Sequence, residues 1–274
     1  MAHRGASSVE AEHTLAAYRR ALDDGADGLE CDVRLTRDGV LVCVHDRTVN
    51  RTSTGRGVVS TLELAELSEL DFGRWHREAN GHGEEDPLLT ANWEAPDYDR
   101  TSVLTLERLL EAVAEVDRPV RLAIETKHPT RYAGLVETTL VSLLQRFGLA
   151  TADGNGKDRV QVMSFAPSGL RRVKQLAPEL PTVHLMRRVA LRHRDGSISP
   201  SASIAGPSVE GVTAFPSYVE RAHRNGYEVH VWTVDEPDDV ARMVELGVDV
   251  LITNQPAAVL AVLDELQGVA ADRA

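Results

Sequence analysis

The sequence predicts a single-domain α/β protein built as a TIM (β/α)8 barrel over residues 1–274. Its 274 residues, 42% of them hydrophobic, suffice for the core of one large α/β domain. From residue 104 to residue 253, short apolar runs typical of strands alternate with segments of helical periodicity, which is the pattern of a parallel sheet. About eight strand–helix units are present along the chain, and this number favours a closed barrel.

The elements follow in order. A first strand ends at His3, with few residues before it, so that strand is expected to be weakly held. Thr14 is a suitable N-cap for a helix over residues 15–25, and residues 28–46 predict a hairpin. Further strands are predicted at residues 118–129, 160–165, 181–186, 209–215, 227–234 and 248–253, with helices at 104–116, 132–148, 167–179, 216–226 and 237–247.

The hairpin carries polar side chains that strand interiors disfavour. Asp38 and Gly39 form a dipeptide typical of a two-residue turn, and that turn would place Asp32 directly opposite His45. Because side chains alternate along a strand, Glu30 would share the face of Asp32. The stretch alone leaves two interpretations open: a functional cluster, or a solvent-exposed hairpin face.

The two cysteines, Cys31 and Cys43, would point to opposite faces of the hairpin in this register. A disulfide between them is therefore not expected, and both are interpreted as small buried hydrophobic residues. The sequence has no Cys/His spacing typical of a zinc site.

The net charge of −12 argues against nucleic acid as a partner and against stable adhesion to an anionic membrane. No apolar run reaches transmembrane length, and the first residues lack the apolar segment of a signal peptide. We therefore expect a soluble, cytoplasmic protein. Such an acidic chain can still bind a small anion where a metal ion and a few basic residues reverse the local field.

Residues 47 to about 100 interrupt the alternation and are interpreted as an insertion on one side of the domain. Residues 47–57 are rich in turn-forming types, residues 61–73 predict a short amphipathic helix, and residues 77–101 are polar and predicted to be irregular.

In such a barrel the carboxyl ends of the strands carry the chemistry. Seven polar side chains fall there, namely His3, Arg4, Glu30, Asp32, His45, Glu125 and Lys127. Three carboxylates at one mouth require a cation, and oxygen-only ligands favour Mg²⁺ or Ca²⁺ over zinc. Two histidines suit a general acid and a general base. Arg4 and Lys127 suit a phosphate clamp. Singly, each residue has a structural explanation, such as an ion pair, but together they indicate phosphoester cleavage.

The block HRGASSVEAEHT…GLECDVRLTRDGVLVCVHD resembles the N-terminal signature of the glycerophosphodiester phosphodiesterase family, within the superfamily of phospholipase-C-like phosphodiesterases. Four further segments resemble the family's later strands, namely IETK, SFAP, VHVWTVDEP and GVDVLITNQP. The likeness therefore runs from residue 3 to about residue 256. The first block is highly specific, whereas the later ones are individually weak.

The resemblance implies a TIM barrel, an insertion near its mouth, and hydrolysis of small glycerophosphodiesters to sn-glycerol 3-phosphate and an alcohol. A substrate glycerol hydroxyl would attack, and water would open the resulting cyclic phosphate. By the same resemblance, Glu30, Asp32 and Glu125 hold a divalent metal ion. His3 and His45 are the catalytic acid/base pair, and Arg4 and Lys127 bind phosphate.

Two segments depart from the family pattern. The family's P-E-N-T appears as residues 11–14, where Ala11 and His13 replace Pro and Asn, so this loop is expected to be looser. The family's T-D-x-P appears with Asn254 in place of the acid, so a charge is missing at that position.

Trp232 is a candidate wall of the substrate pocket, although packing is the commoner role of such an aromatic residue. Two alternatives to the soluble diesterase remain open. The first is a lysophospholipase D-like enzyme, which requires an apolar surface at the mouth, whereas acidic residues interleave the apolar side chains of residues 62–75. The second is a silent barrel that serves as a binding module, which is disfavoured because both histidines and all three carboxylates are present.

Overall fold

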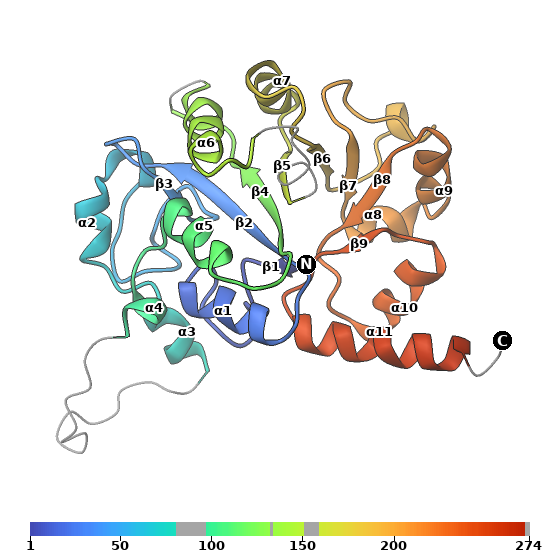
Figure 1. The fold of residues 1–274 in the computed structure, drawn as a ribbon, viewed down its shortest axis with the longest axis horizontal. Helices are drawn as coiled ribbons and strands as arrows, with labels where there is room; N and C mark the ends of the chain where they lie inside the picture. Colours follow the sequence, from blue (N-terminus) through green and yellow to red (C-terminus); the bar gives the residue numbers. More distant parts are fainter. Residues whose placement is uncertain (81–96, 132–133, 151–158, 272–274) are drawn as a thin grey trace.

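The protein is a (β/α)8 barrel, and the computed structural model describes residues 1–80, 97–131, 134–150 and 159–271 (Figure 1). The parallel strands are β1 (Ala2–His3), β2 (Gly28–Leu35), β4 (Arg121–Thr126), β5 (Val160–Ser164), β6 (Thr182–Met186), β7 (Ile204–Pro207), β8 (Glu228–Val231) and β9 (Val250–Leu251). They pair in this order, and an antiparallel strand, β3 (Leu41–Cys43), pairs with β2.

The helices lie around the strands, as α6, α7, α9 and α11 show in Figure 1. Those of the barrel are α1 (Leu15–Asp23), α5 (Leu106–Ala114), α6 (Leu135–Arg146), α7 (Pro167–Leu176), α8 (Val209–Ala214), α9 (Ser217–Arg224), α10 (Pro237–Glu245) and α11 (Pro256–Ala271), with a 3₁₀ turn, η2 (Leu191–His193). Thr14 caps α1 as predicted, since its side chain accepts a hydrogen bond from the amide of Ala17. No helix in the described ranges is long and apolar enough to cross a membrane.

The inside of the barrel is filled by an apolar layer that supports the polar mouth. This layer consists of Ala123, Met163, Val183, Leu185, Ile204 and Ile252, and Trp232 packs against it. Ala123 lies two residues before Glu125 on β4, so both side chains face inward, with Glu125 nearer the carboxyl end of the strand. Apolar packing therefore carries the carboxylates at the mouth.

The short first strand is held on both sides, contrary to its expected weakness. β1 pairs with β2, and the amide of His3 donates to the carbonyl of Thr253 at 2.7 Å. The terminal amine of Met1 donates to the carbonyl of Leu251 at 2.7 Å. These bonds close the barrel between β1 and β9.

The predicted hairpin register is wrong by one residue. The loop contains three residues, Arg37 to Gly39, and Gly39 adopts the left-handed conformation with φ of 85°. The hydroxyl of Thr36 accepts from the amide of Val40 and donates to Asp38, which stabilises this longer loop. Asp32 therefore pairs with Val44, whose amide donates to the carbonyl of Asp32 at 3.0 Å, and not with His45.

The corrected register also changes the cysteines. Cys43 pairs with Val33, which places it on the same face as Cys31 rather than on the opposite face. Both cysteines are free and buried, as expected.

The seventh strand was predicted at residues 209–215, but β7 is Ile204–Pro207 and those residues form α8. Ser208 begins the helix, because its hydroxyl accepts from the amide of Gly211. Gly and Pro in β7 obscure its strand character, since both are depleted in strands.

Residues 47–80 and 97–101 pack beside β3. They contain a 3₁₀ turn, η1 (Val59–Thr61), and the helices α2 (Leu64–Ser68), α3 (Arg74–Ala79) and α4 (Tyr98–Thr101). The predicted amphipathic helix is α2, whereas α3 and α4 correct the expectation of an irregular segment; residues 81–96 lie outside the described residues. Val49, Val59, Leu67 and Phe72 form a buried cluster with Val42 and Val44.

Candidate active site

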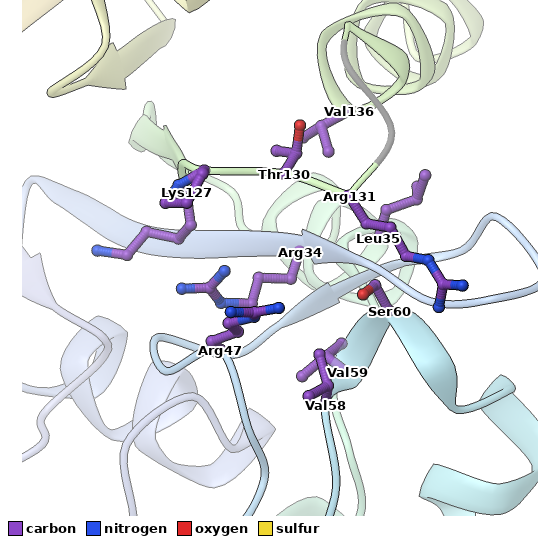
Figure 2. A pocket seen from close by; sticks show the side chains of 11 residues that line it. Arg34, Leu35, Arg47, Val58, Val59, Ser60, Lys127, Thr130, Arg131 and Val136 are labelled. Atoms are coloured by element: carbon purple, nitrogen blue, oxygen red, sulfur yellow. The ribbon is translucent and has the colours of Figure 1, made fainter.

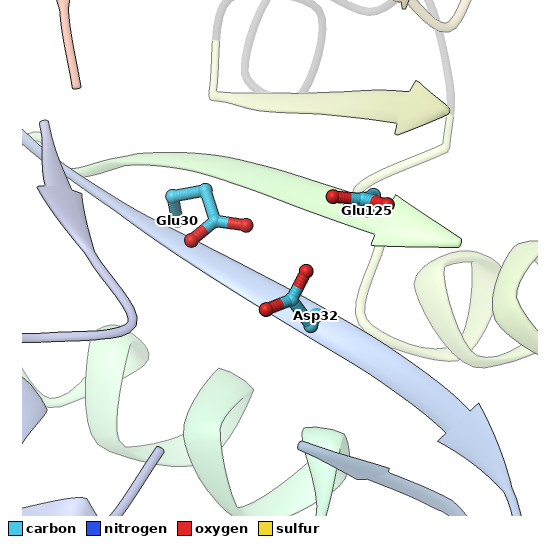
Figure 3. A group of neighbouring side chains, drawn as sticks. All are labelled: Glu30, Asp32 and Glu125. Atoms are coloured by element: carbon cyan, nitrogen blue, oxygen red, sulfur yellow. The ribbon is translucent and has the colours of Figure 1, made fainter. Parts of the chain in front are cut away.

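Three carboxylates meet at the mouth of the barrel, Glu30 and Asp32 midway along β2 and Glu125 near the carboxyl end of β4 (Figure 3). Asp32 and Glu125 are register neighbours on the parallel strands, and Glu30 shares the face of Asp32. Their oxygen atoms come within 4.8 Å of one another, and all three residues are buried. These were the predicted metal ligands, and the fold brings them together.

Burial and mutual repulsion act against ionisation of these three carboxyl groups. Burial and the charge of Asp32 raise the pKa of Glu30 well above its usual range, and raise that of Glu125 to about 8. Burial also opposes ionisation of Asp32, but a hydrogen bond from His13 and the charges of Lys127 and Arg4 hold its pKa well below the usual value. Buried carboxylate oxygens in this proximity fit a hard divalent cation.

Lys127 and Arg4, the predicted phosphate clamp, form ion pairs with these carboxylates. Nζ of Lys127 lies 3.0 Å from Oδ1 of Asp32 and 2.9 Å from Oε1 of Glu125. Nε of Arg4 lies 3.0 Å from Oδ2 of Asp32. Asp32 is therefore enclosed by cations, whereas the other predicted site residues border open space.

The loop after β1 has an unusual backbone that serves these contacts. Arg4 has a φ of 58°, in the left-handed region that few non-glycine residues adopt. In this conformation its amide donates to Oε2 of Glu30 at 3.1 Å, and its side chain reaches Asp32 and Glu12. The turn therefore directs both main-chain and side-chain donors of Arg4 at carboxylates.

His3 is held by a chain of hydrogen bonds from the segments that follow β8 and β9. Nδ2 of Asn254 donates to Asp235 at 2.7 Å, so Oδ1 of Asn254 faces His3 and lies 2.7 Å from its Nδ1. Since that oxygen only accepts, Nδ1 of His3 carries the proton and Nε2 has the free lone pair. Burial lowers the pKa of His3 to about 4, which favours the neutral ring. The charge missing at position 254 is supplied by Asp235 behind it.

His45 is held by a charged partner. Its Nδ1 lies 2.7 Å from Oδ1 of Asp46. Hydrogen bonds from Arg51 hold the pKa of Asp46 well below its usual range, so Asp46 accepts and Nε2 of His45 is left unprotonated in the neutral ring. Although the predicted register was wrong, His45 still reaches the site because β3 ends at Cys43 and the chain turns away from the sheet.

One cavity of about 760 Å³ joins these groups. Its lining includes seven of the eight predicted site residues: His3, Arg4, Glu30, His45, Glu125, Lys127 and Trp232. Asp32 does not line it, because its oxygens are covered by cations. Trp232 packs edge to face against Phe165, with ring centroids 5.4 Å apart, and its Nε1 donates to the carbonyl of Gly206. An aromatic pair therefore forms part of the wall.

Sequence reasoning missed the part played by His13. Nε2 of His13 lies 2.9 Å from Oδ2 of Asp32, and its Nδ1 lies 2.8 Å from the hydroxyl of Tyr18. His13 adopts a φ of 62°, which His tolerates better than most residues. The loop at residues 11–14 is therefore tied to a candidate metal ligand rather than loosened. The signal available in the sequence was the position of His13 between Glu12 and Thr14, the two residues that match the family's P-E-N-T pattern.

The chain is similar to known proteins over nearly its whole length. The model of the Glycerophosphoryl diester phosphodiesterase family matches residues 3–258. A protein of Mycobacterium tuberculosis named probable glycerophosphodiester phosphodiesterase 1 is 44% identical over 268 residues, covering 97% of this chain and 92% of the relative. A glycerophosphodiester phosphodiesterase of Caldanaerobacter subterraneus is 32% identical and covers 95% of both chains.

Among solved structures, a phosphodiesterase of Oleispira antarctica, in complex with the product sn-glycerol-3-phosphate, superposes with a TM-score of 0.78. It is 22% identical, covering 96% of this chain and 95% of the other, and at this identity the likeness supports the fold. With the family match over nearly the whole chain, the expectation drawn from the sequence motifs is confirmed. The chain belongs to the glycerophosphoryl diester phosphodiesterase family and is a phosphodiesterase.

Proposed function

We propose that this phosphodiesterase hydrolyses small glycerophosphodiesters to sn-glycerol 3-phosphate and an alcohol. The observation that carries the proposal is the placement of two histidines, His3 and His45, on one cavity with Glu30 and Glu125, two of the three clustered carboxylates. Glu30, Asp32 and Glu125 would hold the divalent ion, Mg²⁺ or Ca²⁺, which would supply positive charge to polarise the phosphate and to stabilise the charge that develops on it.

Proton transfer is assigned to the two histidines. Nε2 of one histidine takes the proton from a glycerol hydroxyl of the substrate, whose oxygen attacks phosphorus and forms a cyclic phosphate. The other histidine begins the cycle protonated on both ring nitrogens, and its Nε2 gives a proton to the departing alkoxide. Water then opens the ring with the two roles exchanged, so both histidines return to their starting states.

Arg4 and Lys127 orient the phosphate in this proposal. The ammonium group of Lys127 has three donors, of which two contact Asp32 and Glu125, so one is available for a phosphate oxygen. Trp232 is assigned to the wall against the carbon skeleton of the substrate. Residues 47–100 are assigned to the same single domain as the barrel, and a cytoplasmic location stays a prediction.

A lysolipid substrate is not favoured by the described part of the insertion. Leu67 and Phe72 are buried, and Leu62, Leu64 and Leu70 pack against the cluster beside β3. These side chains therefore do not form a free apolar face beside the mouth.

The test is release of glycerol 3-phosphate from glycerophosphocholine, coupled to its dehydrogenase, with Mg²⁺, Ca²⁺ or EDTA. We expect metal-dependent release that falls at least 10²-fold in His45→Ala. The matched control is His223→Ala on α9, whose side chain pairs with Asp249 and does not line the cavity. No release from any diester headgroup by the folded wild type would refute the proposal.

A further inference from the structure

A second, smaller cavity of about 180 Å³ adjoins the candidate active site (Figure 2). It lies between the end of β2, residues 58–60 and the loop after β4. Arg34, Arg47 and Lys127 line both this cavity and the larger one, so the two adjoin at these side chains. We refer to the smaller one as the arginine cavity.

The arginine cavity concentrates positive charge in a protein whose net charge is −12. Four cationic side chains line it: Arg34, Arg47, Lys127 and Arg131. Its other walls include Leu35, Val58, Val59 and Val136, which offer apolar contact. Cations above apolar walls suit an anionic group attached to a short carbon chain.

Arg34 is fixed in place without a carboxylate partner. Its Nε and Nη2 donate to the carbonyl of His45 at 3.0 and 2.7 Å. Within the described ranges, neither Arg34 nor Arg47 forms an ion pair with a carboxylate. A bound anion would supply the paired negative charge that both guanidinium groups lack.

The position of Arg34 links the arginine cavity to the reaction. Because its guanidinium holds the carbonyl of His45, a group bound beside it lies next to a candidate acid/base residue. Lys127 extends from the same region to Asp32 and Glu125. A substrate whose phosphorus lies over the carboxylates can therefore extend its far end toward Arg34 and Arg47.

We propose that the arginine cavity binds a second phosphate group, carried by the leaving alcohol of the diester. This inference rests on the proposed function, which it narrows to substrates with an anionic headgroup. Guanidinium groups bind phosphate through paired, charge-assisted hydrogen bonds, whereas the cationic headgroups choline and ethanolamine would be repelled.

The experiment compares two substrates that differ by one phosphodiester group. Glycerophosphoglycerol has a neutral leaving alcohol, and 1,3-bis(glycerophospho)glycerol has a leaving alcohol that carries a second phosphodiester. We expect kcat/KM to be at least tenfold higher for the second. Arg47→Gln should bring this ratio to within about twofold of unity, and raising the KCl concentration should lower it in the wild type.

The matched control is Arg171→Gln, an exposed arginine on α7 that lines neither cavity and should keep the wild-type ratio. A ratio near one in the wild type, with glycerol 3-phosphate still released, would overturn the inference and leave the proposed function intact. A wild-type ratio near one, together with inhibition by inorganic phosphate that depends on Arg47, would assign the cavity to a free anion. That result would also overturn the inference.

Binding without turnover separates the two proposals if neither substrate is hydrolysed. Calorimetry on EDTA-treated protein should give at least fivefold tighter binding of the bis-phosphodiester, and Arg47→Gln should remove the difference. That result without hydrolysis would refute the diesterase reaction but support the anion site. Equal affinities for the two compounds would overturn the anion site.

Discussion

Asn254 and His3 are joined by a 2.7 Å contact between Oδ1 and Nδ1, across 251 positions of the chain. The donor and the acceptor of this hydrogen bond are fixed. Nδ2 of Asn254 donates to Asp235, so the atom that faces His3 is Oδ1, which can only accept. A residue that replaces the family's acid thus selects the tautomer of a candidate catalytic histidine.

We predict that Asn254→Ala lowers kcat by about tenfold, because His3 loses the partner that orients its ring. The ¹⁵N chemical shifts of the His3 imidazole should show a mixture of tautomers in the variant and mainly the Nδ1-protonated form in the wild type. Ser7→Ala removes another hydrogen bond to Oδ1 of Asn254 and serves as the control, with a smaller effect. An unchanged kcat with unchanged shifts in Asn254→Ala would contradict the relay.

Metal binding should stabilise the fold as well as support activity. A cation that binds only the folded protein raises its melting temperature, and saturation at 100 times Kd contributes about 2.7 kcal/mol. We expect the wild type to melt at a higher temperature in Mg²⁺ or Ca²⁺ than in EDTA, and Glu125→Gln to show little shift. Equal shifts in Glu125→Gln and wild type would place the ion elsewhere.

Glu12 should make stability depend on acidic pH. Although burial opposes its ionisation, hydrogen bonds from Arg51 and the charge of Arg4 lower the pKa of Glu12 to about 2, below its unfolded value of about 4.3. Its contribution, about 3 kcal/mol, is therefore complete above about pH 5 and is lost as the pH falls toward 2.

Urea unfolding of wild type and Glu12→Gln should accordingly differ at pH 7 and converge as the pH approaches 2. The exposed Glu245→Gln should follow the wild type at every pH. A gap between wild type and Glu12→Gln that stays constant down to pH 2.5 would show that the ion pairs of Glu12 do not provide this stability.

Gly169 should be intolerant of a side chain for steric reasons. A Cβ there would lie 2.8 Å from Nε2 of His128 and 3.0 Å from Oε1 of Glu137, which are themselves 2.9 Å apart and largely buried. We expect Gly169→Ala to lower the free energy of unfolding by about 2 kcal/mol. Gly268→Ala in α11, where nothing lies within 4 Å, should be neutral or stabilising by up to about 1 kcal/mol.

Much of this architecture could be predicted because strand ends and site residues coincide in a barrel. Glu30, Asp32 and Glu125 were correctly grouped, since alternation along β2 and parallel pairing with β4 leave one arrangement. The hairpin register was not predictable from Asp38 and Gly39 alone, because both two-residue and three-residue loops place glycine in the left-handed region.

Other features depend on contacts that no local pattern reveals. The hydrogen bonds of Asp235 to Asn254 span 19 residues and exist only once β8 and β9 are paired. His13 contacts Asp32 only because its backbone adopts a positive φ, which the sequence suggests weakly. The contacts of such residues form only in the folded protein, where the strands bring distant loops together.

The closure of the barrel between β1 and β9 has a consequence for synthesis of the protein. His3 leaves the ribosome before Thr253 and Asn254, which hold its backbone and its ring and follow it by about 250 positions. A nascent chain that still lacks them has the three carboxylates but no oriented His3. Catalytic activity should therefore appear only after residue 254 has been synthesised and has left the ribosome, and in refolding experiments it should report the docking of β1 against β9.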